Sequence, residues 1–141
     1  MESSITIEQG KELLLSIKLL DGNKKSFREL LRQYNTDIYK LLGDELSSRG
    51  LTGAQVGVVI NEMYKIWLGK TSREYEGANS KKVRDGISDY ELAICTLAEI
   101  TAIDLLKNND TKNIEDIKEI AQKAANIANA ALDKWREEEM F

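Results

Sequence analysis

The stretch SDYELAICTLAEITAIDLLK, residues 88–107, decides the fold of this chain. Ser88 is followed three residues later by Glu91, the pattern of a capping box, in which each side chain satisfies a backbone N–H group at the start of a helix. At helical spacing, the apolar residues that follow leave almost no polar side. They are Leu92, Ala93, Ile94, Leu97, Ile100, Ala102, Ile103, Leu105 and Leu106. Because a helix that is apolar all round is normally buried, these residues predict a central helix.

The segment after it, from about residue 114 to 138, has the clearest amphipathic pattern in the chain. Many of its apolar residues are alanines, and small side chains let a neighbouring helix approach closely. The residues expected to face the core are Ile114, Ile117, Ile120, Ala121, Ala124, Ile127, Ala128, Ala131, Leu132 and Trp135. We expect a close helix–helix contact along this face.

The segment from about residue 53 to 68 predicts another helix, on the N-terminal side of the central one. It begins at a capping box formed by Thr52 and Gln55, and Gly69 follows as a C-terminal stop. Its expected apolar face consists of Val56, Val59, Ile60, Met63, Tyr64 and Trp67.

A further helix is expected from about residue 27 to 42, opened by the capping-box pair Ser26 and Glu29. Its apolar arc contains Phe27, Leu30, Leu31, Tyr34, Ile38, Leu41 and Leu42. Because Glu45 would fall in the middle of that arc, we expect the helix to stop or bend near Gly43.

The first helix is expected between the capping-box pair Thr6 and Gln9 and the turn at residues 21–23. Leu15 and Leu19 lie one turn apart on a second face, away from the expected core stripe. That core stripe consists of Ile7, Leu13, Leu14, Ile17 and Leu20.

Residues 70–87 form the longest polar stretch and predict a mobile connector, with a short helical turn opened by Thr71. No strand pattern competes with these helices, so the sequence predicts an all-α, single-domain bundle of five main helices over residues 1–141. The connector could divide the bundle into residues 1–69 and 88–141.

The composition excludes several kinds of chemistry. The chain has 141 residues, no histidine, no proline and one cysteine. Without histidine there is no imidazole base, no Ser-His or Cys-His pair and no ordinary zinc site. The lone cysteine and the absence of a long apolar run indicate an intracellular, cytoplasmic protein that does not enter a membrane. We expect no cofactor.

Carboxylates are the remaining candidates for acid–base chemistry or metal binding. Residues 91–105 resemble a helix of the all-α nucleoside triphosphate pyrophosphohydrolases of the MazG type, in which paired ExxE and ExxD motifs hold magnesium. Ile94 stands at the aspartate position of the ExxD motif, and the earlier helices offer no ExxE partner. A carboxylate–metal enzyme is therefore the third hypothesis. Glu99 and Asp104 in the apolar helix are expected to be paired with a lysine or capped by a hydroxyl at the margin of the bundle, and Cys95 to be a small buried residue.

Nucleic-acid binding is the second hypothesis. A basic cluster in the connector, diluted by Glu74, Glu76 and Asp85, could contact phosphate groups. The cluster consists of Lys70, Arg73, Lys81, Lys82 and Arg84. Residues 51–57 also resemble the entry to a helix-turn-helix motif, although Asn61 stands where the glycine of the turn is expected.

Protein binding is the first hypothesis, because some apolar residues lie outside the core-facing stripes of their helices or at the ends of these stripes, where they could contact a partner. Leu15, Leu19 and Val58 leave the apolar arcs of their helices, while Trp67 and Trp135 end theirs. The sequence thus predicts a non-enzymatic adaptor, inhibitor or complex subunit that binds another protein, most simply as a homodimer.

Overall fold

The computed structural model describes residues 24–137, without the side chains of residues 24–27, 132 and 135–137. This part of the chain contains six helices and no strand, so the all-α prediction is confirmed. The helices are α2 (Lys24–Ser48), α3 (Gly53–Trp67), α4 (Ser72–Asn79), α5 (Val83–Gly86), α6 (Asp89–Lys107) and α7 (Ile114–Glu137). The expected first helix lies outside the described residues.

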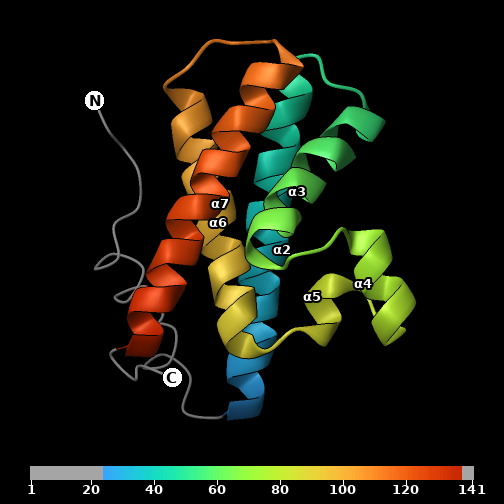
Figure 1. Ribbon diagram of the computed structural model, residues 1–141, viewed down its shortest axis with the longest axis vertical. Coiled ribbons are helices and arrows are strands. Elements are labelled where there is room, and N and C mark those ends of the chain that lie inside the picture. Colours follow the sequence, from blue (N-terminus) through green and yellow to red (C-terminus); the bar gives the residue numbers. More distant parts are fainter. Residues whose placement is uncertain (1–23, 138–141) are drawn as a thin grey trace.

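Four long helices form the bundle (Figure 1), and their pairing joins the two halves of the chain. Helix α6 packs against both α2 and α7, and α3 packs against α7. Every residue of α6 from Leu92 to Glu99 is buried, as expected for a central helix. The alanine face of α7 is buried too, through Ala121, Ala124, Ala125, Ala128 and Ala131. By contrast, α2 and α3 have little direct contact with each other.

The capping boxes predicted for α3 and α6 are both formed. In each box the side chain of Thr52 or Ser88 accepts a bond from the backbone N–H three residues later. The side chain of Gln55 or Glu91 accepts one in return from the backbone N–H of the capping residue. These boxes depend only on neighbouring residues, which explains why the sequence locates them.

Helix α2 is longer than predicted at both ends. It begins at Lys24, so Ser26 lies inside the helix instead of capping it. It also continues past Gly43 to Ser48, because Glu45 forms an ion pair with Arg49 one turn later. The expected stop near Gly43 is therefore wrong.

The polar connector at 70–87 contains two short helices, so it has more regular structure than the single helical turn expected at Thr71. Thr71 does open a helix, α4, through a third capping box with Glu74. Tyr75 of α4 and Val83 of α5 are both buried. In Figure 1, α4 and α5 stand to one side of the four long helices.

The apolar arc predicted for α2 is wider than the face that meets the core. Leu31, Leu42 and Leu46 are fully buried, but Leu30 and Leu41 are 39% and 55% exposed. Asn35 lies among the buried leucines, with none of its surface exposed.

Within residues 24–137, no helix is long and apolar enough to cross a membrane.

Candidate functional site

A buried ion pair joins α5 to the central helix. Arg84 on α5 donates from Nη2 to Oε2 of Glu99 at 2.6 Å and from Nη1 to Oε1 at 3.0 Å. The two side chains are only 10% and 3% exposed. Because both carboxylate oxygens accept from the guanidinium, the geometry is that of an ionised carboxylate held at two points.

Asn35 of α2 completes this pair. Its Oδ1 accepts from Arg84 Nη1 at 2.7 Å, and its Nδ2 donates to Glu99 Oε1 at 3.2 Å and to Thr96 Oγ1 at 2.8 Å. The Thr96 hydroxyl in turn donates to the carbonyl of Leu92. Three helices thus contribute to one hydrogen-bonded network, which offsets the cost of burying the charges.

Two arginines of α2 contact α5 and the start of α6. Arg28 donates to the Asp89 carboxylate at 2.8 Å and to the Arg84 carbonyl at 3.1 Å. Arg32 pairs with Asp85 at 3.3 Å. These contacts tie α2 to α5 and to the start of α6.

Cys95 lies beside the pair, with its Sγ 3.4 Å from Arg84 Nη1. Burial raises the pKa of its thiol to about 12. The thiol is therefore protonated at neutral pH and is not an activated nucleophile. The expectation of a small buried residue is confirmed.

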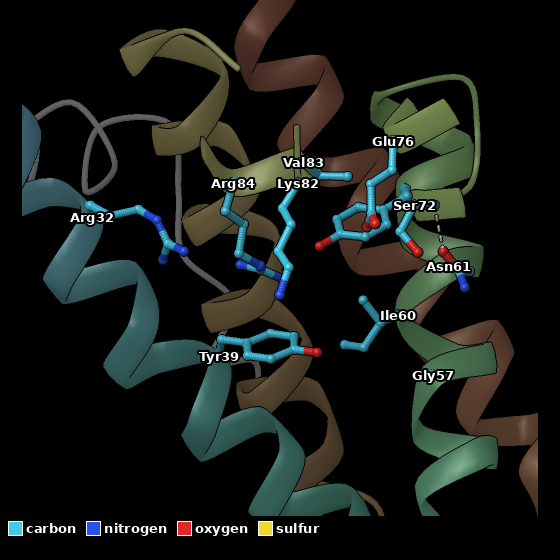
Figure 2. A pocket seen from close by; sticks show the side chains of 11 residues that line it. Arg32, Tyr39, Gly57, Ile60, Asn61, Ser72, Glu76, Lys82, Val83 and Arg84 are labelled. Carbon is cyan, nitrogen blue, oxygen red and sulfur yellow. Dashed lines mark hydrogen bonds between the residues drawn. The ribbon is translucent and has the colours of Figure 1, made fainter. Parts of the chain in front are cut away.

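Above the pair, α2, α3 and the α4–α5 region enclose a cleft of about 300 Å³ (Figure 2). The Tyr39 ring of α2 lies 4.0 Å from the Arg84 guanidinium carbon, as in a cation–π contact. Lys82 extends into the cleft in Figure 2. The other lining residues are Arg32, Gly57, Ile60, Asn61, Tyr64, Ser72, Glu76, Val83 and Arg84.

The predicted basic cluster is divided by the structure. Arg84 is buried in the ion pair, so its placement in a solvent-exposed cluster is wrong. Arg73, Lys81 and Lys82 are exposed, and Lys70 is half-buried.

The residues predicted for a protein interface have different positions. Val58 is 43% exposed, whereas Trp67 is half-buried and packs edge-on against Tyr64 at a centroid distance of 5.7 Å. Leu15 and Leu19 lie outside the described residues, as does the side chain of Trp135.

The expected pairing of Glu99 is confirmed, although its partner is an arginine and the pair is buried rather than marginal. Asp104 is half-exposed. Among the described residues, no group of three or more acidic or cysteine side chains is placed to hold a metal ion.

Sequence reasoning missed Asn35 and the role of Arg84. Asn35 stands one turn after Leu31 on the apolar arc of α2, and a polar residue at such a position is the one local signal of a buried network.

In comparisons with protein-family models, curated proteins and solved structures, no match to this chain was found.

Proposed function

We propose that this chain acts by binding another protein, and that its partner is a second copy of itself. The outward position of Leu30 and Leu41 on α2 carries the proposal. Exposed large apolar side chains that share one helix face are typical of contact surfaces. We call Leu30, Tyr34 and Leu41 the α2 strip.

The α2 strip runs along one side of the helix. Leu30 and Leu41 are three turns apart, or about 16 Å at a rise of about 1.5 Å per residue. Tyr34 lies between them and is half-buried, and burial raises the pKa of its phenol. The strip therefore offers apolar surface at both ends and a polar hydroxyl near its middle.

The α2 strip is also self-complementary. In a twofold dimer the same patch of each copy meets the other, with the two α2 helices antiparallel. A register that places Leu30 against Leu41 of the second copy places Tyr34 opposite Asp37. The phenol could then donate to the exposed Asp37 carboxylate, so this register joins apolar with apolar and donor with acceptor.

The cellular setting is proposed on the same basis as the function. The single cysteine is a buried thiol, which suits a reducing compartment such as the cytoplasm. The absence of reactive machinery in the sequence supports a binding role rather than an enzymatic one.

Size-exclusion chromatography with light scattering tests the dimer. We expect wild type to run as a dimer and Leu41→Glu to run as a folded monomer, because the new carboxylate would be buried opposite apolar surface. Ala54→Glu is the matched control, since it adds the same charge at an exposed position on α3 that belongs to no predicted interface. A monomeric wild type would overturn the proposal, as would a dimer that is lost in Ala54→Glu and kept in Leu41→Glu.

The alternative function, nucleic-acid binding through the connector, has weaker support because the buried Arg84 is removed from the basic surface. The support that remains is the exposure of Arg73, Lys81 and Lys82. It predicts binding that weakens steeply with salt and with neutralisation of Lys81 and Lys82. Absence of binding to duplex and single strands at low salt would remove it.

A further inference from the structure

A glycine of α3, Gly57, leaves space in the cleft between α2 and α3. A glycine in a helix interior costs about 1 kcal/mol relative to alanine, yet Gly57 stands inside α3. A β-carbon at Gly57 would meet nothing within 4 Å, so no neighbouring atom requires the glycine. Because Gly57 lines the cleft, its missing side chain enlarges the space between the two helices.

The charges around the cleft are not all compensated. Arg84 is paired with Glu99, and Arg32 with Asp85. Lys82 forms no hydrogen bond or ion pair with any residue of the described part of the chain, and its side chain points into the cleft (Figure 2). The cleft therefore holds one cation that is available to a ligand.

Uncharged hydrogen-bond donors in the lining also favour a ligand that carries acceptor atoms. The Asn61 Oδ1 accepts from the Ser72 backbone N–H at 2.9 Å, which leaves the Asn61 amide N–H groups as donors. The hydroxyl groups of Ser72 and Tyr39 also line the cleft. Glu76, the one carboxylate in the lining, would repel additional negative charge.

We infer that this cleft binds a small organic monoanion. The anionic group would contact the Lys82 ammonium, and the apolar body would lie against Ile60, the open surface at Gly57 and the Tyr39 ring. One uncompensated cation and one opposing carboxylate favour a single negative charge over a dianion. A volume of about 300 Å³ is at the small end of the range for ligand sites.

The probe for this site is benzoate, titrated into the full chain while backbone amide signals are followed by NMR. We expect the largest shifts at Gly57, Ile60 and Lys82. Benzamide, which has the same shape without the charge, is expected to bind at least tenfold more weakly, as roughly expected for loss of one charge-assisted contact. Phenyl phosphate is expected to bind more weakly than benzoate because of its second charge.

Variants separate the cleft from the general surface. Lys82→Met is expected to weaken benzoate binding roughly tenfold. Its matched control, Lys81→Met, removes a neighbouring exposed cation that does not line the cleft and should bind as wild type does. Glu76→Gln should bind benzoate at least as well as wild type.

Gly57→Leu tests occupancy without removing a contact. It should fold, because its β-carbon meets no atom within 4 Å and the rest of the side chain can extend into the cleft, and it should no longer bind benzoate. The inference is overturned if benzoate causes no shifts in the cleft, if benzamide binds equally well, or if Lys82→Met or folded Gly57→Leu binds like wild type. Tighter binding of phenyl phosphate would overturn the single-charge assignment. These outcomes are independent of whether the chain forms a dimer.

Discussion

Asn35 and Arg84 lie 49 positions apart in the chain, yet the Asn35 side-chain oxygen accepts a 2.7 Å hydrogen bond from the Arg84 guanidinium. The bond links α2 to α5 at the place where both meet the central helix. Arg84 also lines the cleft, so a substitution at Asn35 or Arg84 should change both the stability of the bundle and the shape of the cleft.

Removing the positive partner should be costly. Arg84→Met leaves the Glu99 carboxylate buried without its guanidinium, and we expect a loss of about 3–5 kcal/mol in the free energy of unfolding. Urea denaturation measures it. The double variant Arg84→Met, Glu99→Leu buries no unpaired charge and should recover most of the loss. Equal stability of the single and double variants would contradict this account of the pair.

The same variant should respond to pH. Burial raises the pKa of Glu99, and contact with Arg84 opposes that rise. In Arg84→Met the largest opposing effect is lost, and only the Asn35 hydrogen bond and the more distant charge of Arg32 still oppose the rise, so the folded-state pKa lies further above the unfolded value. Stability from the neutral carboxyl is then fully present below the unfolded pKa and is lost as pH rises through the folded one. We therefore expect Arg84→Met to become less destabilised relative to wild type as the pH is lowered from 7 to 5. A constant difference between the two unfolding curves would count against it.

Arg49 should be needed as an arginine. Its guanidinium pairs with Glu45 and donates to the carbonyls of Leu106, Asn109 and Thr111, which ties the end of α2 to the turn between α6 and α7. Arg49→Lys keeps the charge but loses the fork of donors, so we expect a loss of about 1.5–3 kcal/mol by chemical denaturation. A lysine variant as stable as wild type would show that charge alone suffices.

Two glycines should respond in opposite ways to alanine. Gly57→Ala adds a methyl group in open space inside a helix and should raise the free energy of unfolding by about 1 kcal/mol. Gly86→Ala should lower the melting temperature, because its methyl group would collide with the Tyr75 hydroxyl. Tyr75→Phe removes the hydroxyl and should relieve part of the Gly86→Ala defect. A destabilising Gly57→Ala would mean that the glycine has a structural role that its surroundings do not reveal.

The sequence predicts the features of this fold that depend on neighbouring residues. The capping boxes at Thr52 and Ser88 and the buried length of α6 all follow from local spacing. The length of α2 was also open to prediction, because Arg49 stands one turn after Glu45 and can neutralise it.

The orientation of α2 and the buried network could not be predicted in this way. Seven apolar residues share one arc of α2, and only packing against α6 decides that Leu31 turns inward and Leu30 outward. Arg84 sits in a polar stretch that looks solvated, and its partner Glu99 lies on a different helix. Such pairings are set by the three-dimensional arrangement, which periodicity along one helix does not contain.

The interleaved pairing of the helices has a consequence for synthesis of the chain. The main neighbour of α2 is α6 and that of α3 is α7, so the first half of the described chain finds its packing surfaces in the second half. Before α6 and α7 have left the ribosome exit tunnel, the buried side chains of Leu42, Leu46 and Val59 lack the helices that cover them in the bundle. The four-helix core therefore closes only once α7 has been synthesised, and the apolar faces of α2 and α3 stay exposed until then.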